Sequence, residues 1–188
     1  MVCLTGFMGS GKTTIGRLLA ARLAWHFVDL DVEIERHTGL QISQIFEQKG
    51  EFVFRDMEHE CLTRVLGWAF EQDARVVLAL GGGTHAQPRN AELIRNFGTP
   101  QRPGAAVLWL DCPLEDLLQR CVLMGDRPLF RDETSFRKLY EERLPYYQQS
   151  DFRVESRGEP VKVVERILAL GIFRGPACVI ADGTAPGH

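Results

Sequence analysis

The run Gly6–Thr13 reads GFMGSGKT and matches the pattern G-x-x-x-x-G-K-[ST] in full. It follows the apolar run Val2–Thr5 and precedes a helical pattern, which is the context that this motif requires. Its glycines let backbone N–H groups turn inward around an anion, in conformations that side chains would block. The helix that follows adds its positive amino-terminal end. The run therefore predicts a phosphate-binding loop between a buried strand and a helix.

The polar residues of this loop favour Mg-ATP as its ligand. Lys12 would neutralise charge between the β- and γ-phosphates, and the Thr13 hydroxyl would bind Mg²⁺. We expect the ATP phosphates to contact Gly9, Ser10, Gly11, Lys12, Thr13 and Thr14. The alternative is a glycine-rich turn with a chance lysine, and the strand before it and the helix after it disfavour that alternative.

Short apolar runs alternate with helical patterns along the chain, which indicates an α/β fold with a parallel sheet. The expected strands are Val2–Thr5, Phe27–Asp29, Val76–Leu80, Ala106–Leu110 and Phe152–Glu155. The first helix is expected to bury Ile15, Leu18, Leu19 and Leu23. The last helix is expected to bury Val161, Val164 and Leu168. Pro160 can occupy the first position of that last helix.

Length and charge limit the classes of function. The chain has 188 residues, which suits one compact domain, and its 22 basic and 25 acidic residues give a net charge of −3. This balance argues against a nucleic acid or a membrane surface as the main partner. The sequence shows no secretory leader pattern and no apolar run of the roughly 18 residues that span a membrane. We expect neither a nucleic-acid partner nor a membrane partner.

The cysteines and the loop-rich stretches bear on compartment and organisation. The five cysteines are odd in number and include no C-x-x-C pair, so neither a disulfide framework nor a zinc site fits. We expect a cytoplasmic monomer with one domain over residues 1–170. The charged stretch Met124–Ser135 is expected to form a mobile loop, and the tail Gly171–His188 has no readable role.

Two carboxylates close the second expected strand. Asp29 and Asp31 form a D-x-D pair, and alternate residues of a strand point to the same side. Both could therefore serve a site at the end of the sheet. A helix is expected to begin near Asp31, so helix capping explains the pair equally well.

Two further features lie near the middle of the chain. On a helix, Arg55 and Glu58 share a face and can pair, and the default interpretation of such a pair is a solvated salt bridge. The third expected strand runs into Gly81–Gly83 and ends without the acidic Walker-B residue that P-loop proteins commonly carry there. Three glycines let a ligand approach the main chain closely. A flexible loop is the alternative interpretation of this turn.

In combination these elements resemble the shikimate kinase family, in order and in spacing, from Val2 to about Leu170. The residues that carry the resemblance are the Gly6–Thr13 loop, Asp29-x-Asp31, Phe54-Arg55-x-x-Glu58, Gly81–Gly83, Arg127-Pro128-Leu129 and Arg143-x-Pro145-x-Tyr147. The resemblance implies a three-layer α/β/α P-loop kinase fold of the nucleoside-monophosphate-kinase type. Its parallel sheet would have the strand order 2-3-1-4-5, with a lid loop over about residues 124–135. The implied reaction transfers the γ-phosphoryl group of ATP to the 3-hydroxyl of shikimate, in chorismate and aromatic amino-acid biosynthesis.

The resemblance also assigns an acceptor site. A substrate carboxylate calls for the planar fork of arginine, and the family places Arg55 and Arg143 in that role. Asp31 would orient or deprotonate the attacking hydroxyl, and Glu58 would hold Arg55. The implied substrate-binding set is Asp31, Arg55, Glu58, Gly81, Gly82, Gly83 and Arg143.

On the donor side, the resemblance implies that Asp29 holds Mg²⁺ through water beside Thr13. Arg127 of the lid loop would stabilise the transferred phosphoryl group, so that the catalytic set is Lys12, Asp31 and Arg127. Arg120 would stack on the adenine, with Pro160 on its opposite face. Arg120 could equally be an exposed helix residue.

Two other functions compete with this interpretation. Another small-molecule kinase, for gluconate or a nucleotide, would use the same loop, and the full motif set argues against it. A non-catalytic nucleotide-binding sensor would be expected to lack some of the reactive residues, and this chain keeps Lys12, Asp31 and Arg127.

Overall fold

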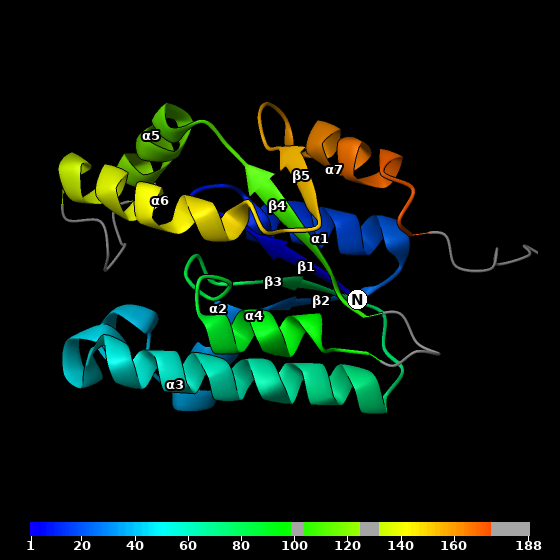
Figure 1. The fold of residues 1–188 in the computed structure, drawn as a ribbon, viewed down its shortest axis with the longest axis horizontal. Coiled ribbons are helices and arrows are strands. Elements are labelled where there is room, and N and C mark those ends of the chain that lie inside the picture. The colour runs from blue at the N-terminus through cyan, green and yellow to red at the C-terminus, as the bar shows by residue number, and fades with distance from the viewer. Residues whose placement is uncertain (99–103, 125–131, 174–188) are drawn as a thin grey trace, which may run out of the picture.

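A computed structural model describes residues 1–98, 104–124 and 132–173 of the chain and shows a parallel sheet between two layers of helices (Figure 1). Within these residues there are five strands, β1 Val2–Thr5, β2 His26–Asp29, β3 Val76–Ala79, β4 Ala106–Asp111 and β5 Phe152–Glu155. Each pairs in parallel with its neighbours in the order β2-β3-β1-β4-β5. The expected order 2-3-1-4-5 is therefore confirmed.

Helices cover both faces of this sheet. They are α1 Lys12–Leu23, α2 Leu30–Thr38, α3 Ile42–Glu71, α4 Pro88–Arg95, α5 Leu114–Met124, α6 Glu133–Tyr147 and α7 Pro160–Ala169. Helices α3 and α4 lie along one face, and α1 and α7 lie together along the other (Figure 1). Because both faces are covered, the central strands β1, β3 and β4 are almost continuously apolar, whereas the edge strands β2 and β5 also carry charged or polar residues.

Strand β1 shows how the sequence divides between the two layers. Val2 and Leu4 belong to the apolar cluster under α1 and α7, whereas Cys3 belongs to the cluster under α2 and α3. This division follows from the alternation of side chains along a strand. All three residues are at most 3% exposed, so the central strand is buried on both sides.

The helix faces agree with the expected ones in part. Ile15 and Leu19 of α1 are buried, but Leu18 is 36% exposed. In α7 the buried residues are Val163, Val164 and Ile167, and Val161 is 49% exposed. The predicted buried face of α7 was therefore wrong, and the observed face is rotated by part of a helical turn. Apolar residues in α7 are frequent enough to fit more than one face. Pro160 does occupy the first position of α7.

The stretch expected to be a lid divides between described and undescribed residues. Helix α6 begins at Glu133, and the Asp132 side chain caps it by accepting a hydrogen bond from the Ser135 backbone. Arg127 lies outside the described residues, and so does the tail beyond residue 173.

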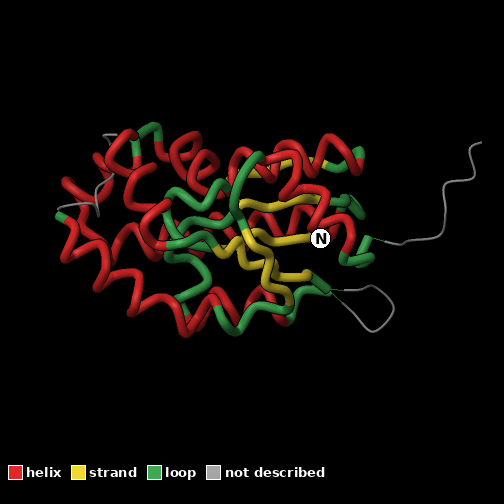
Figure 2. The backbone as a smooth tube through the Cα atoms, turned by 90° about the horizontal axis from the view of Figure 1, so that it is seen from above, coloured by secondary structure: helices red, strands yellow, loops and turns green. Residues whose placement is uncertain are grey.

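The carboxyl ends of the strands share one end of the molecule. Viewed from above, the loops that follow the strands gather there between helices (Figure 2). In open α/β sheets this end is where ligands bind. Gly6, Asp29 and Leu80 lie directly at or beyond three neighbouring strand ends.

Candidate functional site

The loop after β1 has the backbone that its glycines predict. Gly6, Gly9 and Gly11 have φ angles of 142°, 80° and 92°, which L side chains rarely adopt. A Cβ on Gly6 would also lie 2.8 Å from the Leu110 carbonyl oxygen. Gly11 is the N-cap of α1, so the loop ends at the positive end of that helix.

Lys12 lies over this loop. Its Nζ donates hydrogen bonds to the carbonyl oxygens of Gly6 at 2.8 Å and Phe7 at 3.0 Å. The ammonium group is thus held within the curve of the loop, where phosphate oxygens would meet it. A cavity of about 260 Å³ opens here, lined by Met8, Gly9, Gly11, Lys12, Thr13, Thr14, Asp29, Asp31, Leu80 and Gly82.

Asp29 caps a helix, as one of the two interpretations expected, and also contacts the phosphate-binding loop. Its Oδ1 accepts a hydrogen bond from the Asp31 backbone at 3.1 Å and so caps α2. Its Oδ2 accepts one from the Thr13 hydroxyl at 2.7 Å. Capping therefore holds the carboxylate in place while its second oxygen faces the loop.

A second pocket adjoins the first. It is lined by Met8, Asp31, Ile42, Phe46, Phe54, Arg55, Glu58, Gly81, Gly82, Gly83 and Arg143. Met8, Asp31 and Gly82 line both pockets. Asp31 thus lies where a group bound in the second pocket would meet a phosphate bound in the first.

Arg55 and Glu58 form the ion pair that their spacing predicts, but the pair is not solvated. Arg55 is 8% exposed and Glu58 is fully buried. Arg55 Nη1 donates to both Glu58 oxygens, at 3.0 and 3.2 Å, and the Thr84 hydroxyl donates to Glu58 at 2.7 Å. The expectation of a surface pair was wrong because α3 packs this face against the glycine turn.

The environment of Arg55 keeps it charged. Burial lowers the pKa of Arg55, but the neighbouring Glu58 and Glu51 carboxylates outweigh it, and the pKa is raised overall. Glu51 accepts from Arg55 Nη2 at 3.0 Å, and its own side chain is 57% exposed. Arg55 is therefore a fixed cation at the wall of the second pocket.

The turn Gly81–Gly83 leaves room for these charged groups. A Cβ on Gly81 would lie 2.7 Å from Asp31 Oδ1 and 3.1 Å from Glu58 Oε1. A Cβ on Gly83 would lie 2.8 Å from Arg55 Nη2 and 3.0 Å from Arg143 Nη2. The shorter contact in each case lies below the roughly 3.0 Å that Cβ atoms keep from other atoms, so close approach, more than flexibility, explains Gly81 and Gly83.

Helix α6 supplies the second arginine. Arg143 is 7% exposed, and its guanidinium carbon lies 5.8 Å from the centre of the Phe7 ring. One turn later the Tyr147 hydroxyl donates to the Gly82 carbonyl oxygen at 2.5 Å. Burial raises the pKa of Tyr147, so this donor keeps its proton. The turn is thereby fastened to the helix that carries Arg143.

Several residues of the site received no role from the sequence. Thr84 follows the glycine turn directly, and Tyr147 shares a helix face with Arg143, so position alone could have indicated both. Phe46 and Phe54, with ring centres 4.6 Å apart, form an apolar wall. Phe54 belongs to the motif Phe54-Arg55-x-x-Glu58 that carries the family resemblance, whereas no sequence signal separates Phe46 from an ordinary core residue.

Arg120 lies against the phosphate-binding loop. The residue is half-buried, and its Nη1 donates to the Gly9 carbonyl oxygen at 3.1 Å. The Ser156 hydroxyl, after β5, similarly donates to the Ser10 carbonyl oxygen at 2.8 Å. Arg120 is therefore not a fully exposed helix residue, and its stacking on an adenine stays a prediction.

The described residues hold neither a cluster of metal-ligand side chains nor a helix that could span a membrane. They contain no group of three or more histidine, cysteine or carboxylate side chains that could hold a metal ion. None of their helices combines the length and the apolar character needed to cross a membrane.

Comparisons with known proteins agree on one family. The family model described as shikimate kinase matches residues 8–170. The shikimate kinase of Persephonella marina is 40% identical over 169 residues, covering 89% of this chain and 96% of the relative. That of Gloeobacter violaceus is 39% identical over 187 residues, covering 97% and 96%.

Solved structures extend this likeness to the fold. Shikimate kinase from Acinetobacter baumannii, in complex with shikimate, matches with a TM-score of 0.80 and 36% identity over 90% of each chain. A gluconokinase from Sinorhizobium meliloti matches with a TM-score of 0.57 at 16% identity, covering 89% of each chain. The second match shows a shared fold alone.

Proposed function

Because this chain belongs to the shikimate kinase family, we propose that its two adjoining pockets carry out that family's reaction. The γ-phosphoryl group of ATP passes to the 3-hydroxyl of shikimate, giving shikimate 3-phosphate and ADP. The observation that carries the proposal is that Asp31 lines both the phosphate pocket and the pocket with the two arginines. An acceptor hydroxyl beside Asp31 would therefore face a phosphate held by the loop.

The acceptor is held by charge. Arg55 and Arg143 present guanidinium groups to one pocket, and two such forks suit a carboxylate. Glu58 and Glu51 hold Arg55 in place. The carboxylate end of shikimate would bind these arginines and the glycine turn, and the ring would lie against the apolar wall.

Asp31 serves the reacting hydroxyl. Its carboxylate can accept the hydrogen bond that orients the hydroxyl for in-line attack, and it can take the proton as the new O–P bond forms. Lys12 stabilises the charge on the β- and γ-phosphates. Positioning and charge stabilisation supply most of the rate in reactions of this class.

The oxygen donors at the loop fit a magnesium ion. The Thr13 hydroxyl and the Asp29 carboxylate are hard ligands 2.7 Å apart, and Mg²⁺ is commonly held by one or two protein oxygens together with phosphates and water. We propose that Thr13 and Asp29 hold the Mg²⁺ of Mg-ATP, Asp29 through water. Bound there, the ion would neutralise charge on the phosphate oxygens.

Three further residues complete the proposed nucleotide site. The contact of Arg120 with Gly9 supports a role near the adenine, with Pro160 on the opposite side of the base. Arg127 is proposed, from the family resemblance, to stabilise the transferred phosphoryl group.

We propose that the protein is a cytoplasmic monomer whose catalytic domain spans residues 1–170. The four cysteines in the described residues are all free and buried, which suits a reducing compartment. Residues 171–188 remain a tail without an assigned role.

The release of ADP tests the proposed function against its alternatives. The protein is incubated with Mg-ATP and, in separate reactions, with shikimate, gluconate, a nucleoside monophosphate or no acceptor. We expect ADP release with shikimate alone. Release with gluconate would favour a different polyol-acid kinase, and nucleotide binding without turnover on any acceptor would favour a sensor.

A further inference from the structure

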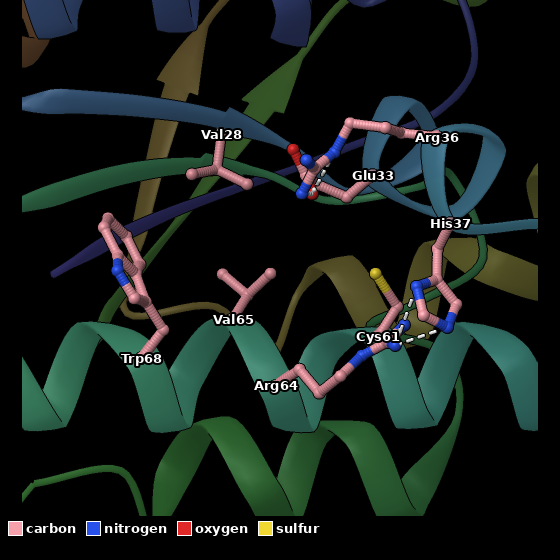
Figure 3. A pocket seen from close by; sticks show the side chains of 8 residues that line it. All are labelled: Val28, Glu33, Arg36, His37, Cys61, Arg64, Val65 and Trp68. Atoms are coloured by element: carbon pink, nitrogen blue, oxygen red, sulfur yellow. Dashed lines mark hydrogen bonds and ion pairs between the residues drawn. The ribbon is translucent and has the colours of Figure 1, made fainter.

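A cavity of about 450 Å³ lies between α2 and α3 and shares no lining residue with the two pockets of the active site. Its wall is formed by Val28, Glu33, Arg36, His37, Cys61, Arg64, Val65 and Trp68 (Figure 3). The volume falls in the range of small-molecule sites, about 300–1,000 Å³. The reaction proposed above gives this cavity no role.

One end of the cavity is apolar. Val28 of the edge strand β2 faces Val65 and Trp68 of α3 across the opening (Figure 3). Trp68 is 40% exposed, and the edge-on ring of His26 lies beside it, with ring centres 5.5 Å apart. A partly exposed indole beside two valines is a surface on which a flat ring could lie.

The other end is cationic. Arg64 of α3 reaches across to α2, where its Nη1 lies 2.6 Å from His37 Nε2 and 3.0 Å from His37 Nδ1 (Figure 3). Arg36 is paired with Glu33 at 2.7 Å. Within the described residues, by contrast, no carboxylate lies within ion-pair distance of Arg64. Among the described residues, Arg64 thus contacts His37 and the Cys61 side chain but forms no ion pair.

We propose that the cavity binds a small aromatic carboxylate, with its ring against Val65 and Trp68 and its carboxylate on Arg64. The two ends can bind two parts of the same ligand. The indole can pack against a flat apolar ring, and the arginine can donate two hydrogen bonds to a carboxylate. The spacing along α3 supports this, since Arg64 and Trp68 are four residues apart on one helix face.

Benzoate is a suitable probe, and the indole N–H signal of Trp68 in a ¹H–¹⁵N NMR spectrum is the readout. The chain has three tryptophans, so Trp68→Phe identifies the signal. Because the arginine pocket of the active site could also accept benzoate, the titration is done with shikimate in excess. We expect the Trp68 signal to move in a saturable way with benzoate, and benzamide, which has the ring without the charge, to bind at least about tenfold more weakly.

Arg64→Ala should weaken benzoate binding by about tenfold or more, because a charge-assisted hydrogen bond is lost. Arg22→Ala is the matched control, since Arg22 lies in the last turn of α1, away from the cavity lining. Equal affinity in Arg64→Ala and the parent protein would overturn the proposal. So would a Trp68 signal that stays fixed while benzoate binds elsewhere. Neither result depends on the kinase activity, so this site and the proposed function can fail separately.

Discussion

At the scale of single residues, Glu58 stabilises the second pocket, called the acceptor pocket below because it is proposed to bind the phosphoryl acceptor. It is fully buried, and it accepts hydrogen bonds from Arg55 and from Thr84. A buried carboxylate is tolerated only where such partners compensate for the loss of water. Arg55 in turn needs the carboxylate to keep its fork in one orientation. The two residues therefore form one unit, in which Arg55 is proposed to bind the substrate carboxylate and Glu58 fixes the orientation of Arg55.

Glu58→Gln should show how much the negative charge of Glu58 contributes, because the substitution removes the charge and keeps the side-chain size. The amide keeps the volume but leaves Arg55 without its buried counter-charge, so we expect a higher KM for shikimate. We also expect the free energy of unfolding to fall by about 1–3 kcal/mol, since a hydrogen-bonded charge pair is lost. Urea unfolding and steady-state kinetics measure the two effects. An unchanged KM together with unchanged stability would show that the pair has no role in the pocket.

Gly83→Ala should test the close approach at the glycine turn. Its φ angle is not among the left-handed ones, so alanine suits the backbone, and the added Cβ would press on Arg55 and Arg143. We expect KM for shikimate to rise at least about tenfold, because both guanidinium groups proposed to bind its carboxylate are displaced. The affinity for ATP should be retained.

Gly67→Ala is the matched control for that substitution. Gly67 lies within α3, and a Cβ there would meet no atom within 4 Å. Alanine should leave the kinetics unchanged and stabilise the helix by up to about 1 kcal/mol. If Gly83→Ala behaved like this control, the steric explanation of the turn would be wrong.

At the scale of elements, α3 is two helical segments joined at Gly50. This residue has φ 81° and ψ 169°, outside the helical region. The short segment before it carries Ile42 and Phe46, which line the acceptor pocket, and the long segment after it carries Arg55 and Glu58. The bend therefore lets one element form two walls of the same pocket.

Gly50→Ala should destabilise the protein for a conformational reason alone. No atom lies within 4 Å of the added Cβ, yet the backbone angles are essentially confined to glycine, at a cost of about 1–3 kcal/mol for other residues. Gly39→Asn is the control, because Gly39 caps α2 in the left-handed helical region that asparagine tolerates. Urea unfolding should show the larger loss for Gly50→Ala. Equal losses would mean that the bend is not constrained.

The elements also show how far the sequence alone reaches. The alternation of apolar runs predicted the parallel strands, and the G-x-x-x-x-G-K-[ST] pattern predicted the loop, because both follow from local spacing. Strand order came from the family resemblance, since spacing along the chain does not say which strands are neighbours. The burial of Glu58 and the bond from Tyr147 to Gly82 depend on packing between distant segments. For that reason the pair Arg55–Glu58 looked like a surface pair.

At the scale of the whole molecule, the described residues form three apolar clusters that hold the layers together. Two lie on the faces of the sheet. The third joins the phosphate-binding loop to α5 and α6, and in it the Phe7 ring packs edge-on against Phe136 and Tyr140, with ring centres 5.0 and 5.3 Å away. One apolar cluster therefore positions both the phosphate-binding loop and α6, the helix that carries Arg143. It fixes the position of the phosphate pocket relative to the second pocket.

A buried thiol in the central strand of the sheet makes the free energy of unfolding depend on pH in the alkaline range. Burial raises the pKa of the Cys3 thiol from 9.0 to about 12. Between these values the unfolded chain has lost a proton that the folded chain retains, so the free energy of unfolding falls as pH rises. The contribution is fully present below pH 9 and decreases on the order of 1 kcal/mol per pH unit above it.

Cys3→Ala isolates this contribution from other groups that titrate at high pH. Unfolding in urea is followed from pH 8 to pH 11 for both proteins. We expect the parent protein to lose stability more steeply above pH 9, although the variant starts lower because a core side chain is truncated. Parallel curves would contradict the assignment to Cys3.

The central claim is that a phosphoryl group passes from ATP, bound at the loop, to a hydroxyl beside Asp31 on a substrate whose carboxylate the two arginines hold. ³¹P NMR of one reaction containing the protein, Mg-ATP and shikimate tests it directly. We predict ADP together with one phosphomonoester, coupled to the proton on carbon 3 of shikimate. ADP accompanied only by inorganic phosphate, or an ester at another hydroxyl, would contradict the account.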